Sequence, residues 1–60
     1  MKRGIAAWQV AKMKQAQEYC DKEDKSMEFM FQYMKDVARV SHEDVMAFLT
    51  NNYVVIRGIK

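Results

Sequence analysis

The stretch Ser26–Val40, SMEFMFQYMKDVARV, decides the fold that this sequence of 60 residues predicts. It holds three of the six methionines and two of the three phenylalanines. Its apolar residues recur at steps of three or four, which is the spacing of one helix face: Met27, Met30, Met34, Val37 and Ala38. Phe29 and Tyr33 widen that face, and Phe31 lies on another side of the helix. A helix that is apolar over so wide an arc is normally covered from more than one direction, so we expect contacts beyond one neighbouring helix.

The residues before this stretch predict a second helix, antiparallel to the first, over residues 5–20. Ala6, Val10, Met13 and Cys20 fall on one stripe of it, and its alanines favour helix intrinsically. Residues 21–25, DKEDK, contain no apolar side chain, and Asp24 or Ser26 can cap the helix that follows. We therefore predict a short connection there, with one continuous helix as the alternative.

The sequence after the central stretch predicts a short third helix and an extended tail. Ser41-His42-Glu43-Asp44 resembles a capping box, in which a serine and an acid three residues later satisfy each other's backbone amides. The helix should span residues 42–50 and end where asparagines tolerate a left-handed conformation. The tail, YVVIRGIK, favours β structure, but a lone strand cannot pair with itself. We expect it to lie extended on the helices or to join a partner's sheet.

These elements make one all-α domain over residues 1–60, and the composition indicates how it is completed. A chain of this size buries only about 60% of its unfolded surface and usually needs a staple or an oligomer. The single cysteine, Cys20, allows no disulfide within the chain and fits a reducing, cytoplasmic compartment. No apolar run approaches the roughly 20 residues that span a membrane, so we expect no membrane partner. A homo-oligomer or a protein partner is the expected completion.

Neither of the chemically versatile side chains suggests catalysis. His42 is the only histidine, and the acids that follow it do not converge with it on one point. Cys20 has no histidine or aspartate in a catalytic pattern, and a free cysteine is most often a buried apolar residue. We therefore expect no enzyme activity, no catalytic or metal-binding residue, no cofactor and no small-molecule substrate.

Residues 8–49 resemble the helical part of tail-assembly chaperones of long-tailed phages. The similarity lies in the order of a helix, an acidic connection, a helix like MEFMFQYMKDV and a capped helix like SHEDVMAFL. The resemblance implies binding to a tape-measure protein in the host cytoplasm before tail polymerisation. It places the matching apolar face at Phe29, Met30, Tyr33 and Met34, and it implies no catalytic residue.

The function that these observations favour is protein–protein interaction, of the kind used by small assembly factors. The helix face rich in methionine and phenylalanine would be buried against a partner or a second copy. Phe31 and Trp8 are the expected anchors, because large residues off the main intrachain contact carry binding energy well. The predicted partner-binding residues are Trp8, Phe29, Met30, Phe31, Tyr33 and Met34.

The alternative is a small DNA-binding regulator. Residues 36–52, DVARVSHEDVMAFLTNN, look like the start of a LacI-type helix-turn-helix region. Two features count against this alternative. The usual turn with its glycine is missing after Arg39, which leaves too little loop between the two helices. In addition, Glu43 and Asp44 would repel phosphates where a recognition helix normally begins. With a net charge of only +2, nucleic acid is the less favoured partner.

Overall fold

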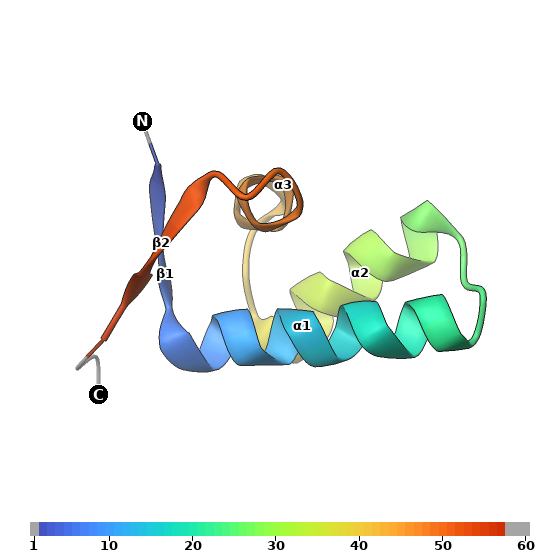
Figure 1. Ribbon diagram of the computed structural model, residues 1–60. Coiled ribbons are helices and arrows are strands. Elements are labelled where there is room, and N and C mark those ends of the chain that lie inside the picture. Colours follow the sequence, from blue (N-terminus) through green and yellow to red (C-terminus); the bar gives the residue numbers. More distant parts are fainter. Residues whose placement is uncertain (1, 58–60) are drawn as a thin grey trace.

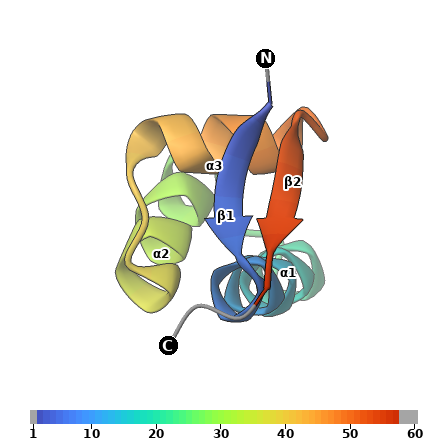
Figure 2. The same cartoon turned by 90° about the vertical axis from the view of Figure 1, so that its left-hand side faces the viewer.

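The computed structural model describes residues 2–57 and shows three helices beside a small sheet (Figure 1). In chain order the elements are β1 (Arg3–Ala6), α1 (Ala7–Lys22), α2 (Met27–Ala38), α3 (His42–Leu49) and β2 (Tyr53–Ile56). Helices α1 and α2 lie antiparallel, α3 runs across them, and the two strands lie side by side where α1 begins (Figures 1 and 2). Within the described residues, no helix combines the length and the apolarity needed to cross a bilayer. The all-α prediction is confirmed in part: the described residues are mostly helical, but they also form a small parallel sheet of two strands.

The connection between α1 and α2 is a true break, as the DKEDK run predicts, although α1 runs through Asp21 and Lys22 and so ends two residues later than predicted. Asp24 adopts a left-handed conformation with φ 55°, and the amide of Lys25 donates to the carbonyl of Cys20 at 2.9 Å. This is the hydrogen-bond pattern of a Schellman end, although glycine usually occupies the left-handed position. The hydroxyl of Ser26 then accepts from the amide of Phe29 at 3.1 Å and caps α2.

The short third helix also begins and ends on the predicted signals. The hydroxyl of Ser41 accepts from the amide of Asp44, and a carboxylate oxygen of Asp44 accepts from the amide of Ser41, both at 3.3 Å. At the other end Asn51 has φ 57°, and the amide of Asn52 donates to the carbonyl of Ala47 at 2.8 Å. The capping box and the asparagine end are confirmed, and the helix stops one residue before the predicted end, at Leu49.

Both ends of the chain differ from the prediction, because they form a sheet together. Residues 5 and 6, predicted as helix, belong to β1, and α1 begins at Ala7. Strand β1 pairs in parallel with β2, with Arg3 opposite Tyr53 and Ala6 opposite Ile56. The prediction that the tail would find no partner strand inside the chain is therefore wrong. Ile5 and Ala6 continue the apolar spacing of α1, but pairing with residues about 50 positions away outweighs that local preference.

The core lies where α1, α2 and α3 meet beside β1. Met30 and Met34 of α2 face it, and Met34 is completely buried, as are Met13, Ala38 and Val45. Helix α1 packs along the wide apolar arc of α2, and helix α3 covers a further part of it. The buried residues are Ile5, Ala6, Val10, Met13, Ala16, Cys20, Met30, Met34, Ala38, Val40, Val45, Ala47 and Phe48.

Candidate protein-binding surface

Three aromatic rings gather at the end of the molecule where α1 turns into α2. The rings of Phe29 and Tyr33 are stacked with centroids 5.7 Å apart, and the rings of Tyr33 and Tyr19 are tilted with centroids 5.4 Å apart. Despite these contacts, Tyr19 is 42% exposed and Phe29 is 40% exposed. We call Tyr19, Phe29 and Tyr33 the aromatic surface.

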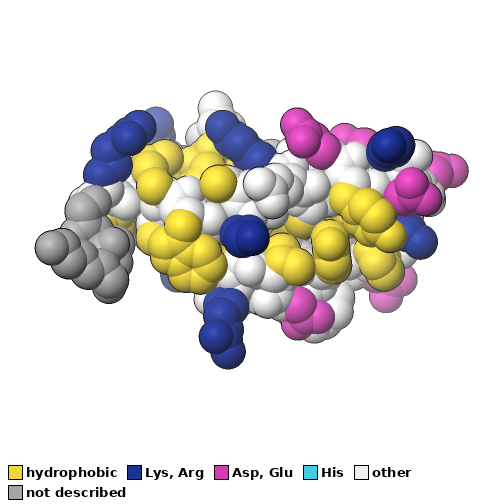
Figure 3. Space-filling model, turned by 90° about the horizontal axis from the view of Figure 1, so that it is seen from below, with side chains coloured by type: hydrophobic (Ala, Val, Ile, Leu, Met, Phe, Trp, Pro, Cys, Tyr) yellow, Lys and Arg dark blue, Asp and Glu magenta, His cyan; other side chains and the backbone are white. Residues whose placement is uncertain are grey.

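The helical hairpin explains why these rings meet. Phe29 and Tyr33 are four residues apart on α2 and so lie on one side of that helix, and the antiparallel return places the last turns of α1, with Tyr19, beside them. The ammonium group of Lys25 lies 5.1 Å from the centroid of the Phe29 ring, within the range of a cation–π contact. Figure 3 views the molecule from below relative to Figure 1. On that side the hydrophobic side chains form two groups, one toward the strands and one toward the α1–α2 turn.

A shallow groove lies on the other side of α2. It has a volume of about 370 Å³ and is open to solvent, and it is lined by Met27, Glu28, Phe31, Gln32, Lys35 and His42. The rings of Phe31 and His42 lie 5.2 Å apart, so the half-buried Phe31 holds the start of α3 against α2. A polar ridge separates the groove from the aromatic surface, with Gln32 donating to Asp36 at 3.1 Å.

The structure therefore divides the six predicted partner-binding residues into four groups. Phe29 and Tyr33 lie together on the aromatic surface, and Phe31 lies in the groove across the polar ridge. Met30 and Met34 are buried in the chain's own core and present no surface. Trp8 is exposed on the second residue of α1, at the opposite end of the hairpin from the aromatic surface. One flat partner face cannot cover all six residues. Tyr19, which is not among the six predicted residues, completes the aromatic surface.

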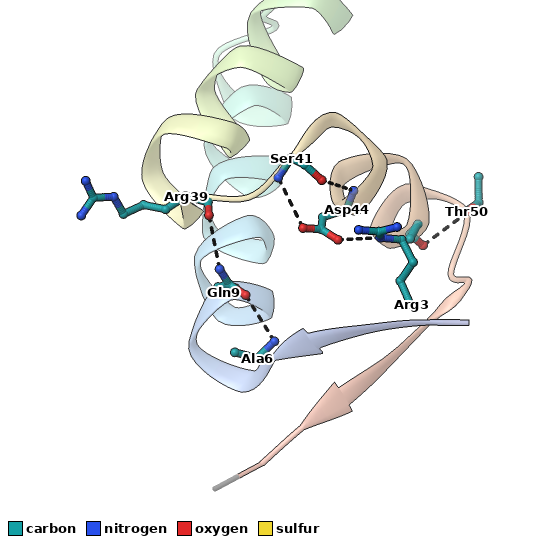
Figure 4. A network of polar contacts seen from close by, with 8 residues as sticks. Arg3, Ala6, Gln9, Arg39, Ser41, Asp44 and Thr50 are labelled. Atoms are coloured by element: carbon teal, nitrogen blue, oxygen red, sulfur yellow. Dashed lines mark hydrogen bonds and ion pairs between the residues drawn. The ribbon is translucent and has the colours of Figure 1, made fainter. Parts of the chain in front are cut away.

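A polar network holds the start of α1 against the end of α2 (Figure 4). The side-chain oxygen of Gln9 accepts from the amide of Ala6 at 3.3 Å. Its side-chain nitrogen donates to the carbonyls of Ala38 and Arg39, at 3.2 and 3.4 Å. Arg39 is left-handed, with φ 56° and ψ 49°, and ends α2. The sequence signal for this role is weak, because a glutamine at the third position of a helix also suits an ordinary exposed site.

Asp44 joins the start of α3 to β1. Arg3 donates to its carboxylate at 2.7 Å, and the other oxygen accepts from the amide of Ser41 (Figure 4). Partial burial raises the pKa of Asp44, but the hydrogen bonds from Arg3 and Ser41, with the positive charge of Arg3, outweigh it and leave the pKa lowered. The acid that would repel DNA at this helix start thus has a structural role.

The two chemically versatile side chains, Cys20 and His42, belong to different helices, α1 and α3. Cys20 is buried in the core, and burial, followed by the nearby charge of Asp21, raises the pKa of its thiol against the opposing effect of Lys25. His42 is exposed on the first residue of α3. Across residues 2–57, no three histidine, cysteine or acidic side chains come together as metal ligands would.

Comparison with protein-family models, with curated proteins and with solved structures found no match for this chain in any of the three. The geometry of the aromatic surface therefore stands alone as the basis for a functional proposal.

Proposed function

We propose that the protein is a non-catalytic protein-interaction module whose aromatic surface binds an apolar helix face of a partner protein. The observation that supports this is the exposure of Tyr19 and Phe29, while Phe48 on α3 is an aromatic residue that the chain buries in its own core. Aromatic side chains are enriched at the centres of protein interfaces and are depleted where only solvent is met.

The ring contacts make the aromatic surface suitable for binding. Phe29 and Tyr33 already restrain each other, as do Tyr33 and Tyr19, so a partner would lose little side-chain entropy in ordering them. Fully burying a large apolar side chain is worth roughly 1.5–3 kcal/mol. Because Tyr19 and Phe29 are each about 40% exposed, a partner would gain only part of that from each. Micromolar rather than picomolar affinity is the expectation.

Within this proposal, the narrower role of an assembly factor for phage tails remains a prediction. The face matched in that resemblance contains Phe29, Met30, Tyr33 and Met34, of which Phe29 and Tyr33 reach the surface while Met30 and Met34 are buried. A tape-measure segment would therefore be recognised through the two aromatic side chains and the neighbouring Tyr19.

The test is affinity capture of partners from the source cells with wild-type protein and two serine variants. Phe29→Ser removes an exposed ring of the aromatic surface, and Met46→Ser is the control, since Met46 on α3 is 43% exposed and outside the aromatic surface. We expect one protein to be captured by wild type and by Met46→Ser and lost with Phe29→Ser, while circular dichroism shows all three folded. Equal capture by both variants would contradict the proposal.

A DNA-binding function is the second candidate, because the turn after α2 is better formed than the sequence suggests. Arg39 takes the left-handed conformation usually left to glycine, so residues 39–41 join α2 to α3 without the missing glycine. The expectation of too short a loop is therefore wrong. Against this candidate, α3 carries no lysine or arginine and exposes Glu43 at its start. Fluorescence anisotropy with labelled duplex at low salt decides it, and we expect no binding.

A further inference from the structure

Strand β2 leaves one of its edges unpaired. In a strand, the amide and carbonyl of successive residues point to opposite edges, and Arg3 of β1 donates to the carbonyl of Asn52 at 3.3 Å. The backbone groups of Val54 and Ile56 therefore point toward β1, and those of Tyr53, Val55 and Arg57 point away from it. Figure 2 shows no strand or helix of residues 2–57 beside β2 on that outer side.

The outer edge of β1 has fewer backbone groups free to pair with another strand. By the same alternation, Gly4 and Ala6 point their backbone groups away from β2. The amide of Ala6 is already bound to the side chain of Gln9 at 3.3 Å, which closes that end of the edge. The edge of β2 is thus the longer free edge of the described sheet.

The residues of β2 do nothing to block pairing. Natural proteins protect an exposed edge with charged residues, proline or a bulge. Tyr53-Val54-Val55-Ile56 contains none of these, and Val54, Val55 and Ile56 are between 39% and 48% exposed. A sheet of two strands is also marginal by itself in water, so further strands would stabilise it.

We propose that the free edge of β2 pairs with β2 of a second copy of this chain, antiparallel about a twofold axis at Val55. The result is a four-stranded sheet in the order β1-β2-β2-β1. In this register the amide and carbonyl of Val55 bond to those of Val55 in the other copy, and Tyr53 pairs with Arg57 in both directions. The dimer uses a different surface from the aromatic surface and does not depend on the proposed function.

The charges fit this register. The only charged residue on the edge, Arg57, lies opposite Tyr53 and is four residues away along the strand from the equivalent Arg57. Like charges that oppose each other destabilise a strand pair, and this arrangement keeps them roughly 13 Å apart. A register centred on Tyr53 would bring the left-handed Asn51 opposite Val55 and lose those bonds.

The twofold axis at Val55 makes a charge-swap experiment decisive. Val55→Lys places two ammonium groups opposite each other, and Val55→Glu places two carboxylates there, so each variant alone should bind its own copy at least about tenfold more weakly. An equimolar mixture of the two variants should form heterodimers. Val54→Lys is the matched control, because it adds the same charge one residue away at a side chain that is 48% exposed, against 40% for Val55.

Sedimentation velocity from micromolar to millimolar protein gives the oligomeric state, and circular dichroism checks folding. We expect dimers for wild type, Val54→Lys and the mixture, and monomers for each Val55 variant alone. A monomeric wild type, equal effects of Val54→Lys and Val55→Lys, or a monomeric mixture would overturn the proposal. Should the Val55 variants fail to fold, hydrogen exchange of wild type decides: the Val55 amide must gain protection as concentration rises, and exchange independent of concentration overturns the proposal.

Discussion

Replacing Gln9 with alanine should cost about 1–3 kcal/mol of the free energy of unfolding, an unusual loss for a partly exposed glutamine. The side chain makes three contacts, at 3.3, 3.2 and 3.4 Å, to Ala6, Ala38 and Arg39 in that order. These lie at the long end of the hydrogen-bond range, so each is counted at about 0.5–1 kcal/mol. The carbonyl of Ala38 is partly buried, so water replaces its lost donor incompletely.

That loss is large for this protein. At roughly 0.05–0.15 kcal/mol per residue, a chain of 60 residues has about 3–9 kcal/mol in total. Urea unfolding followed by circular dichroism should shift to a midpoint about 1–3 M lower, since the slope for so small a domain is near 1 kcal/mol per molar. The fluorescence of the single tryptophan, Trp8, gives an independent second probe of the same transition.

Two further variants separate the bridge to α2 from a local effect on α1. Gln15→Ala makes the same change in helix propensity at an exposed site of α1, and it should alter stability by less than about 0.5 kcal/mol. Gln9→Glu keeps the acceptor for Ala6 but sets a carboxylate against the carbonyls of Ala38 and Arg39. This variant should have a lower free energy of unfolding than wild type at neutral pH. Its stability should rise again as the introduced carboxylate becomes protonated and can donate a hydrogen bond. Equal stability of Gln9→Ala and Gln15→Ala, or a Gln9→Glu variant as stable as wild type at neutral pH, would refute the reasoning.

Three other residues give simpler tests. The pKa of Asp44 is lowered on folding, so its contribution to stability is present above the unfolded pKa of about 3.9 and is lost as pH falls through the folded value. In Asp44→Asn the free energy of unfolding should therefore fall less steeply as the pH is lowered. A pH profile unchanged from wild type would count against the contact between Asp44 and Arg3. Arg39→Gly should raise stability by about 0.5–1 kcal/mol in thermal unfolding, because glycine adopts the left-handed conformation without strain; no gain would mean that the arginine side chain compensates. Native Cys20 should react with Ellman's reagent at least about tenfold more slowly than in urea, since its thiol is buried and its pKa raised; equal rates would place it at the surface.

The candidate site could be predicted only in part. Apolar spacing identifies Phe29 and Tyr33 as neighbours on one helix, but it gives Met30 and Met34 the same weight. The packing of α1 and α3 against α2 decides that the methionines are buried while Phe29 stays exposed. Tyr19 joins the rings only because the hairpin returns at Asp24, and the length of α1 fixes that contact.

The sequence by itself determined the features that depend on a few neighbouring residues. Ser26 and Ser41 cap helices, Asn51 ends one, and the polar run 21–25 breaks the chain into two helices, because each acts on backbone groups within one turn. Tyr53–Ile56 favours β structure by its own residues, but only the tertiary structure decided that it pairs with Arg3–Ala6. Arg3–Ala6 has no strand pattern of its own, and it becomes a strand because α3 delivers Tyr53–Ile56 alongside it. Hydrogen bonds between segments about 50 residues apart depend on how the helices pack, and no local window of sequence contains that information.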